Sequence, residues 1–294
     1  MSGRVLVIGA SGLVGRHVVE VLGPTRALPT YRGEVAGGLR LDITDQNASE
    51  RVIANTSPSA VVLAAADAYV ERCEAEPLET RRINVDAAAA IARASRAVGA
   101  RLVVFSSEYV FDGSAGAYDE DDTRHPINEY GRQKVELEDI ARTDPRALIC
   151  RTSGVFGPDP RGKNFVMQLC AALRAGKPFE VPTDQLITPT AASSLARAVI
   201  ALCDRGNAGT YHVAGPEIMA RVEFALLVAK TYGLPAGLIT PRTSKQMGLR
   251  AERPPRAGLR IDKLVRTIGP VQALGDALRA WDPFIVSSRP MESR

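Results

Sequence analysis

Tyr130 and Lys134 stand four residues apart in the stretch NEYGRQK (128–134), and their side chains are suited to moving a proton. On a helix, residues four apart lie on one face, so the phenol and the ammonium would project in the same direction. A neighbouring ammonium favours the phenolate and would lower the phenol pKa from its ordinary value of about 10. We therefore expect Tyr130 to act as a general acid and Lys134 to tune it.

A pair of serines precedes this stretch at the end of a strand-like segment, RLVVFSS (101–107). The carboxyl ends of parallel strands are where open α/β sheets bind their ligands. A serine hydroxyl placed there can hold a carbonyl oxygen and stabilise the charge that develops on it. Ser107, Tyr130 and Lys134 therefore form a set suited to reducing a carbonyl group, given a fold that also binds a hydride donor.

The start of the chain has the pattern of a dinucleotide-binding turn. RVLVIG (4–9) is typical of a buried strand, GASGLVG (9–15) follows at once, and apolar residues then recur with helical spacing. In this context the glycines permit a tight turn, close approach of a pyrophosphate and close packing of the helix, whose free N–H groups favour phosphates. The expected cofactor contacts are Gly9, Ser11, Gly12, Leu13, Val14 and Gly15.

The end of the next strand-like segment, ALPTYR (27–32), indicates which dinucleotide is used. Sheets that bind NAD usually place an acid there to bond the ribose 2′-hydroxyl. This chain has Arg32, whose guanidinium suits a 2′-phosphate, and Arg26 is a second candidate. We expect NADP(H) as the preferred cofactor and NAD(H) as the alternative.

Strand-like and helix-like segments alternate through the first half of the chain. This alternation predicts an α/β protein with a Rossmann-type, doubly wound parallel sheet and a smaller C-terminal substrate-binding lobe. We expect strands at 4–9, 27–32, 38–42, 60–66, 101–107, 147–153 and 209–215, and helices from 13, at 48–55, 78–98, around Tyr130, and at 163–175, 192–204 and 221–231. The expected domains are 1–155 with about 184–215 for the dinucleotide, and about 156–183 with 216–294 for the substrate.

Composition and charge exclude several classes of protein. The net charge of +4 comes from interleaved charges of both signs, so we expect no nucleic-acid partner. No apolar run reaches the roughly 20 residues of a membrane span, and no signal peptide is evident, which predicts a cytoplasmic protein. Four scattered cysteines predict reduced thiols and no metal site. We expect His125 and His212 to be structural, and the acidic run 119–122 to be a solvated loop.

Together these segments resemble extended short-chain dehydrogenases/reductases and, among them, the dTDP-4-dehydrorhamnose reductase group. The resemblance is carried by GASGLVG (9–15), LDITD (41–45), AAA (64–66), SSEYVFDG (106–113), YGRQK (130–134), RTSGVFG (151–157), DQLITPT (184–190) and GTYHVAG (209–215). It implies that Ser107 polarises a carbonyl group, that Tyr130 donates the proton, and that Lys134 binds the nicotinamide ribose.

The same resemblance implies further contacts. Asp42 and Ile43 would border the adenine, Ala64, Ala65 and Ala66 would line the cofactor, and Asn84 would support the catalytic region. The implied substrate contacts are Ser107, Glu108, Val110, Gly154, Asn164, Phe165 and Gln185. The chain departs from the family at Gly154, where a bulky aromatic is usual, and at Phe156, where the family has a phenol, so we expect a more open sugar pocket. Arg253 and Arg256 are candidates for contact with an anionic substrate, with a solvated loop as the alternative.

The resulting expectation is NADPH-dependent reduction of a keto group at C4 of a nucleotide-activated deoxysugar or a related polar substrate, by a monomer or homodimer with no membrane partner. Two alternatives stay open. The first is a regulatory subunit that binds NADP and acts on a partner enzyme, as the regulatory subunit of methionine adenosyltransferase does in the same group. The second is a nucleotide-sugar epimerase or dehydratase, which shares the scaffold.

Overall fold

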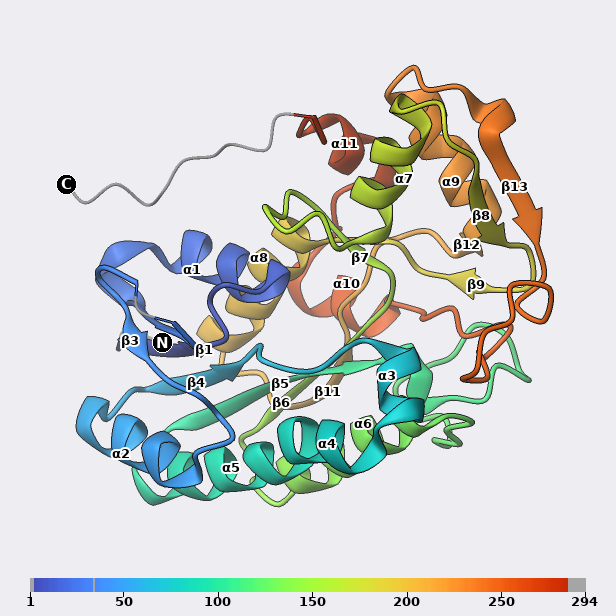
Figure 1. The fold of residues 1–294 in the computed structure, drawn as a ribbon. Coiled ribbons are helices and arrows are strands. Elements are labelled where there is room, and N and C mark those ends of the chain that lie inside the picture. Colours follow the sequence, from blue (N-terminus) through green and yellow to red (C-terminus); the bar gives the residue numbers. More distant parts are fainter. Residues whose placement is uncertain (1–2, 34, 285–294) are drawn as a thin grey trace.

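A parallel sheet of seven strands forms the centre of the molecule (Figure 1) in the computed structural model, which describes residues 3–33 and 35–284. The strand order is β11-β6-β5-β4-β1-β2-β3, and all six pairings are parallel. The order turns back between β1 and β4, which creates a crevice at the carboxyl ends of the strands. The predicted Rossmann-type sheet is confirmed, including the return of segment 209–215. The strands are β1 (Val5–Ile8), β2 (Ala27–Tyr31), β3 (Leu39–Arg40), β4 (Ala60–Leu63), β5 (Arg101–Ser107), β6 (Leu148–Thr152) and β11 (Gly209–His212).

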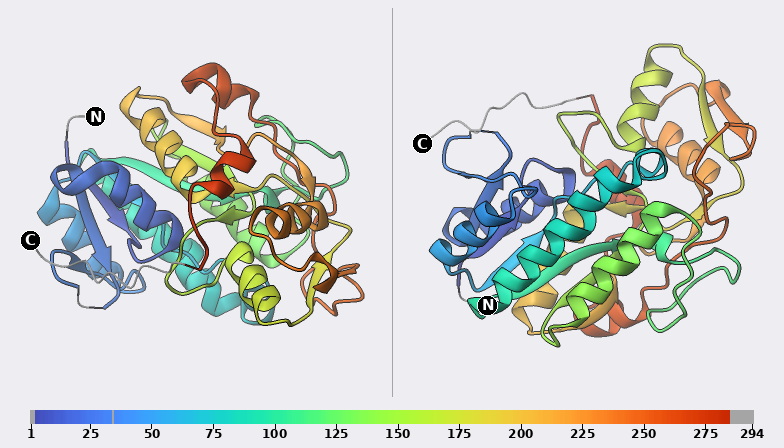
Figure 2. Two further views of the ribbon diagram at one scale, coloured as in Figure 1. Left: turned by 90° about the horizontal axis from the view of Figure 1, so that it is seen from above. Right: turned by 60° about the horizontal axis from the view of Figure 1, so that its bottom comes forward.

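Helices cover both faces of this sheet. Val5 and Val7 of β1 point to one face and Leu6 and Ile8 to the other, because successive strand residues alternate. Both faces are therefore apolar, as a sheet covered on two sides requires. Figure 2 shows α5 and α6 side by side on one face. The first face carries α1 (Leu13–Arg26), α8 (Ala192–Asp204) and α10 (Asp262–Ile268), and the second carries α2 (Gln46–Thr56), α5 (Ala87–Ala97) and α6 (Glu129–Arg142).

The helix predicted at 78–98 contains a wider turn. After α3 (Val70–Ala75), the chain forms α4 (Pro77–Arg81), a π-helical turn η1 (Arg82–Asp86) and then α5. Such π-helical turns occur frequently at functional sites. Asn84 lies within this one.

The C-terminal half adds short elements beside the main sheet. The apolar residues of α7, α9 and α11 and of the strand pair β8 and β13 form a core separate from that of the main sheet. Helices are present in the three expected segments, 163–175, 192–204 and 221–231. Residues 285–294 of the expected C-terminal lobe lie outside the described residues. The elements of this half are α7 (Phe165–Arg174), α9 (Arg221–Thr231), α11 (Leu274–Arg279), the strand pairs β7 (Val155–Phe156) with β10 (Thr190–Ala191), β8 (Phe179–Pro182) with β13 (Ile239–Arg242) and β9 (Leu186–Ile187) with β12 (Met219–Ala220), and the 3-10 helix η3 (Ala236–Leu238). A further 3-10 helix, η2 (Glu108–Val110), follows β5.

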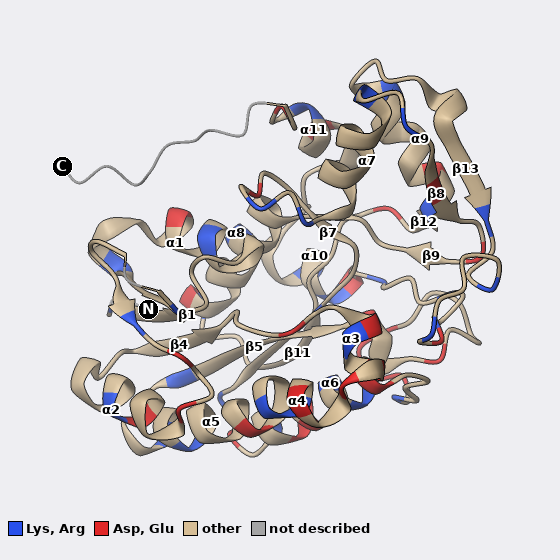
Figure 3. Ribbon diagram, in the orientation of Figure 1, with Lys and Arg blue, Asp and Glu red and all other residues tan. Residues whose placement is uncertain are grey.

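Charged side chains of both signs are spread over the described elements (Figure 3). Cys73, Cys150, Cys170 and Cys203 are buried free thiols. Among residues 3–33 and 35–284, no helix has the length and apolar character to cross a bilayer. The same residues contain no group of three or more His, Cys, Asp or Glu that could hold a metal ion.

Candidate active site

The three residues expected to perform chemistry lie together at the carboxyl end of β5. Ser107 is the last residue of β5, and Tyr130 and Lys134 lie in the first turns of α6. None of the three is more than 8% exposed. The Asn128 side chain caps α6 by accepting a hydrogen bond from the Gly131 N–H group (2.8 Å), which fixes where the helix begins.

Gly131 allows α6 to lie close to the turn that follows β5. A Cβ atom at Gly131 would lie 2.2 Å from the carbonyl oxygen of Tyr109, so a larger residue would push the helix away. The Tyr109 ring packs edge-on against the Tyr130 ring, with the centroids 5.6 Å apart. The glycine inside the YGRQK segment is therefore a packing requirement for the placement of Tyr130.

The phenol and ammonium groups share one face of α6, as the spacing predicts. Lys134 Nζ lies 5.5 Å from the centroid of the Tyr130 ring and donates a hydrogen bond to the carbonyl oxygen of Phe105 (2.9 Å). Burial lowers the pKa of Lys134 to about 8.

The expected lowering of the Tyr130 pKa is wrong for this structure. Burial raises the pKa of the phenol, and the nearby Glu108 carboxyl adds to the rise, while Ser107 acts in the opposite direction. The ammonium of Lys134 is turned toward Phe105 and does not offset the burial. The phenol is thus kept protonated, which is the form that a proton donor needs.

Ser107 is connected to a buried carboxyl group on the adjacent residue. Ser107 Oγ lies 2.6 Å from Glu108 Oε2, and Ser107 also acts to lower the pKa of the Tyr130 phenol. The second oxygen, Glu108 Oε1, accepts a hydrogen bond from Ser153 Oγ (3.1 Å). Burial raises the pKa of Glu108. The site therefore combines two hydroxyl groups, a phenol and a carboxyl group with little access to water.

Asn84 holds the loop after β4 against α6. Its Oδ1 accepts a hydrogen bond from the Asp67 N–H group (2.8 Å), and its Nδ2 donates to the Asp67 carbonyl oxygen (2.9 Å) and to Gln133 Oε1 (2.7 Å). Gln133 precedes Lys134, so this bridge braces the helix at the site. Asn84 supports the site indirectly, through the backbone of Asp67 and the side chain of Gln133. No pattern in the sequence pointed to Gln133.

The glycine turn has the close contacts that a dinucleotide fold needs. Gly9 has φ +91°, and a Cβ atom there would lie 2.6 Å from the backbone nitrogen of Ala65 in the segment Ala64–Ala66. A Cβ atom at Gly15 would lie 2.2 Å from the carbonyl oxygen of Gly9. Gly12 is the N-cap of α1 and brings no side chain to the N–H groups of the first turn. These residues fit the pyrophosphate of a dinucleotide at the start of α1.

Arg32 lies at the carboxyl end of β2 and is paired with Asp42. Arg32 Nε is 3.1 Å from Asp42 Oδ2, and the Arg32 side chain is 85% exposed. Hydrogen bonds from Thr44 and the Arg32 charge lower the pKa of Asp42. Ile43 is buried beside Asp42. The structure excludes Arg26 as the second candidate, since it precedes β2 at the opposite end of the strand.

The departures at Gly154 and Phe156 have different consequences. Gly154 has φ +51°, and a Cβ atom there would lie 3.3 Å from Ile187 Cδ1, so the backbone disfavours any side chain at this position. Phe156 is fully buried in the C-terminal core, with its ring centroid 5.4 Å from that of Phe224. The expectation that Phe156 changes the sugar pocket is therefore wrong, because its side chain faces the core.

Two other expected substrate contacts, Asn164 and Val110, have structural partners within the chain. Asn164 is the N-cap of α7, accepting from the Met167 N–H group (3.3 Å) and donating to the Gly157 carbonyl oxygen (2.8 Å). Val110 is fully buried in a small apolar cluster with Phe111. Both ends of the Asn164 amide are thus already hydrogen-bonded within the chain, and the Val110 side chain packs in the apolar cluster.

The remaining expected substrate contacts, Phe165 and Gln185, lie beside Arg221. The guanidinium carbon of Arg221 is 4.7 Å from the Phe165 ring centroid, and its Nη1 is 3.5 Å from Gln185 Oε1. Arg253 lies over the Tyr109 ring, with its guanidinium carbon 5.8 Å from the ring centroid. Sequence reasoning named Arg253 but missed Arg221, whose only signal was its place at the start of an expected helix.

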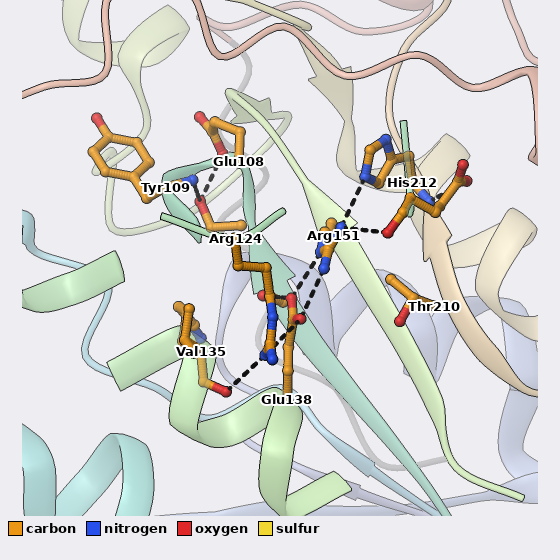
Figure 4. Close-up of polar contacts among 12 residues, drawn as sticks. Glu108, Tyr109, Arg124, Val135, Glu138, Arg151, Thr210 and His212 are labelled. Atoms are coloured by element: carbon orange, nitrogen blue, oxygen red, sulfur yellow. Dashed lines mark hydrogen bonds and ion pairs between the residues drawn. The ribbon is translucent and has the colours of Figure 1, made fainter. Parts of the chain in front are cut away.

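A second buried carboxyl group, Glu138, lies one helical turn beyond Lys134 on α6. Figure 4 shows it together with Arg151 and Arg124. Arg151 donates two hydrogen bonds to it, from Nε to Oε1 (2.8 Å) and from Nη2 to Oε2 (2.9 Å), and Ser106 Oγ donates a third (2.6 Å). Arg124 and Arg142 add ion pairs at 3.4 and 3.1 Å. This cluster ties α6 to β5 and β6.

His212 extends that cluster to β11. Its Nε2 lies 3.4 Å from Arg151 Nη1, and its Nδ1 lies 3.0 Å from the carbonyl oxygen of Arg260. Burial and the charge of Arg151 lower the pKa of His212 to about 3, so the ring is neutral. His125, by contrast, is an exposed residue 3.4 Å from a carboxylate oxygen of Asp112.

Comparisons with known proteins agree with this fold along most of the chain. The family model described as the RmlD substrate binding domain matches residues 3–281. Methionine adenosyltransferase 2 subunit beta of Danio rerio is 30% identical over 279 residues, covering 89% of this chain and 84% of that protein. The dTDP-4-dehydrorhamnose reductase of Sinorhizobium fredii is 29% identical over 278 residues, covering 90% and 92%. The structure of dTDP-4-dehydrorhamnose reductase from Bacillus anthracis in complex with NADP superposes with a TM-score of 0.87 at 27% identity, covering 95% of this chain and 98% of that one.

Proposed function

The chain belongs to the RmlD substrate-binding domain family, and from that membership we propose that it reduces a keto group, at C4, of a nucleotide-activated deoxysugar. As a member of the family it is an NAD(P)-dependent oxidoreductase that prefers NADP(H), with NAD(H) as the alternative. The observation that carries the proposal is the meeting of Ser107, Tyr130 and Lys134 at the carboxyl end of β5. This end of the sheet also holds the glycine turn.

Each residue of the set has a separate task in the proposed reaction. NADPH, when bound, supplies a hydride to the carbonyl carbon. Ser107 holds the carbonyl oxygen and stabilises the negative charge that develops on it. Tyr130 gives its proton to that oxygen, and burial keeps the phenol protonated until then. Lys134 holds a ribose hydroxyl and keeps a positive charge beside the phenol.

The first test is oxidation of NADPH against a panel of nucleotide-linked 4-ketosugars and simpler ketones. The wild-type protein is expected to turn over at least one 4-ketosugar. Tyr130→Phe is expected to lose about 10²- to 10⁴-fold in turnover while its NADPH affinity stays nearly the same. Equal turnover by the two proteins would show that Tyr130 is not the proton donor.

A second candidate function is that of a regulatory subunit that binds NADP and acts on a partner enzyme. It is favoured by the similarity to the Danio rerio protein, whose name describes a subunit of methionine adenosyltransferase. The two functions differ in a direct measurement: a stoichiometric complex with a partner enzyme, without turnover of any ketosugar, would support the subunit. The third alternative, an epimerase or dehydratase, would retain NAD through purification.

The division into two lobes belongs to the same proposal. It is supported by the separate apolar core that α7, α9 and α11 form away from the main sheet. Arg221 at the start of α9 lies over the ring of Phe165, which starts α7, and its charge acts on the phenol of Tyr109. We place the substrate between these helices and the carboxyl end of β5.

A further inference from the structure

Glu108 is a buried carboxyl group that the mechanism proposed above does not use. It is only 6% exposed and follows Ser107 directly in the chain. Its oxygens contact hydroxyl groups, with Ser107 Oγ 2.6 Å from Oε2 and Ser153 Oγ 3.1 Å from Oε1. The positive charge of Arg221 acts on Glu108 more weakly than burial and these hydrogen bonds do. A carboxyl group in such surroundings can exist as the acid near neutral pH.

Ser153 favours one oxygen of Glu108 as the site of a proton. Ser153 Oγ accepts a hydrogen bond from the Thr188 N–H group (3.0 Å) and donates its own hydrogen to Glu108 Oε1. As long as Ser153 donates to it, Oε1 is an acceptor whether or not Glu108 is ionised. A proton on Glu108 belongs on Oε2, the oxygen that faces Ser107.

Ser107 has one hydrogen to share among its partners, and this makes the state of Glu108 important. Its oxygen already receives the Tyr109 N–H group (3.3 Å). If Glu108 is a carboxylate, it attracts the Ser107 hydrogen, because Ser107 Oγ lies 2.6 Å from Oε2. If Glu108 is an acid, its own proton satisfies that contact, and the Ser107 hydrogen is free to point toward the Tyr130 phenol and a carbonyl oxygen beside it.

We propose that Glu108 is a positioning residue whose protonation state sets the direction of the Ser107 hydroxyl. This inference rests on the reductase function proposed above, because the free hydrogen matters only if Ser107 must stabilise a developing oxyanion. With Glu108 as the acid, Ser107 donates to the carbonyl oxygen. With Glu108 ionised, Ser107 donates to Glu108, and a negative charge lies near the oxyanion.

The consequence is that reduction is lost as pH rises through the pKa of Glu108, which burial raises above its ordinary value. The other ionisable groups that act on Glu108 or respond to its charge are the phenols of Tyr109 on η2 and Tyr130 on α6, and the guanidinium of Arg221 on α9. Burial raises the pKa of both phenols, so they stay protonated while Glu108 ionises. Lys134, with its pKa of about 8, is the remaining group of the site that titrates in this range.

The decisive variant is Glu108→Gln, because the amide imitates the protonated acid. Its oxygen can accept from Ser153 and its NH₂ group can donate to Ser107. We would measure kcat/KM against pH with NADPH and a 4-ketosugar that the wild type reduces. The wild type is expected to lose about tenfold per pH unit above the Glu108 pKa, whereas Glu108→Gln should lack this limb. A variant that keeps the limb would overturn the proposal, since the limb would then belong to another group such as Lys134.

Two controls test whether Glu108 acts through the Ser107 hydroxyl and not through a general effect of its charge. Glu180→Gln removes an exposed glutamate on β8 that pairs with Arg242 and should keep the basic limb. In a Ser107→Ala background, Glu108→Gln should leave the shape of the pH profile unchanged, because the hydroxyl through which it acts is gone. A change in profile without Ser107 would show that Glu108 acts by another route.

A readout without substrate distinguishes this inference from the proposed function. The infrared difference between the wild type and Glu108→Gln at neutral pH should contain the carbonyl band of a protonated carboxyl group. A carboxylate band at neutral pH would overturn the inference even in an active reductase. A carboxylic acid band in a protein that reduces no ketosugar would support protonated Glu108 and count against the reductase.

Discussion

Glu108 and Glu138 are two buried glutamates that hydrogen-bond neighbouring serines of β5, each at 2.6 Å. Glu138 is fully buried and Glu108 is 6% exposed, so water reaches neither freely. Their partners differ. Glu138 receives two hydrogen bonds from Arg151 and ion pairs from further arginines, whereas Glu108 receives hydrogen bonds from hydroxyl groups.

The partners decide whether the pKa of each glutamate rises or falls on burial. The hydrogen bonds and charge of Arg151 lower the pKa of Glu138, although burial alone would raise it. At Glu108 the hydroxyl groups do not offset burial, and the pKa rises. A carboxylate with matched cations holds its charge and ties elements together, while one with neutral partners can change its charge at working pH. The arrangement at Glu138 is suited to stabilising the fold, and the arrangement at Glu108 is suited to a group that changes its protonation state in an active site.

The largest expected effect comes from breaking the Glu138 cluster. Arg151→Met leaves the buried carboxylate of Glu138 with two partly exposed arginines and should destabilise the protein by about 3–5 kcal/mol. Urea unfolding followed by circular dichroism measures this loss. The double variant Glu138→Leu/Arg151→Met should recover part of it, because the unpaired charge is gone. A loss below about 1 kcal/mol for Arg151→Met would contradict the structural role given to the pair.

The two serines should separate activity from stability. Ser107→Ala should lower kcat by about 10²- to 10³-fold, since it removes the hydroxyl that we propose holds the carbonyl oxygen. Ser106→Ala should instead lower the free energy of unfolding by about 1–3 kcal/mol, since it removes a donor from the buried carboxylate of Glu138. Steady-state kinetics and urea unfolding on both variants check the contrast. Similar kinetic losses from the two substitutions would break the distinction between the two regions.

The glutamates should also give opposite dependence of stability on pH. The folded-state pKa of Glu138 lies below its unfolded value of about 4.3, so its contribution is complete above that pH and is lost as pH falls through the folded pKa. The folded-state pKa of Glu108 is raised, so its contribution is complete below about pH 4.3 and is lost as pH rises through the folded pKa. Glu108→Gln should therefore become more stable relative to wild type as pH rises, measured by urea unfolding in a series of buffers. A difference that is constant with pH would mean that Glu108 is ionised in the folded protein as it is in the unfolded one.

Local sequence patterns predicted those features that depend on residues close together in the chain. The strand–glycine–helix start, the period of the strands and the i, i+4 placement of Tyr130 and Lys134 follow from neighbours a few residues apart. Arg151 and Glu138 could not be paired this way, since they come from different elements and meet only in the folded core. The sign of the Tyr130 pKa shift was missed for a related reason: spacing predicts a nearby ammonium but not the depth of burial. Phe156 was assigned to a pocket because its motif was known, and only packing shows that it faces Phe224.

The smallest expected effect concerns a third carboxylate, Asp42, which is exposed and paired with Arg32. An exposed ion pair contributes little to stability, so Arg32 can exchange Asp42 for the 2′-phosphate of NADPH. Arg32→Ala should lower the preference for NADPH over NADH by about tenfold, measured as the ratio of the two dissociation constants. Asp42→Asn is the matched change: it should raise the preference, because the guanidinium no longer has a competing anion. An unchanged ratio in Arg32→Ala would remove Arg32 from the cofactor site. If Asp42→Asn instead lowers the preference for NADPH over NADH, Asp42 orients the guanidinium toward the 2′-phosphate and does not compete for it.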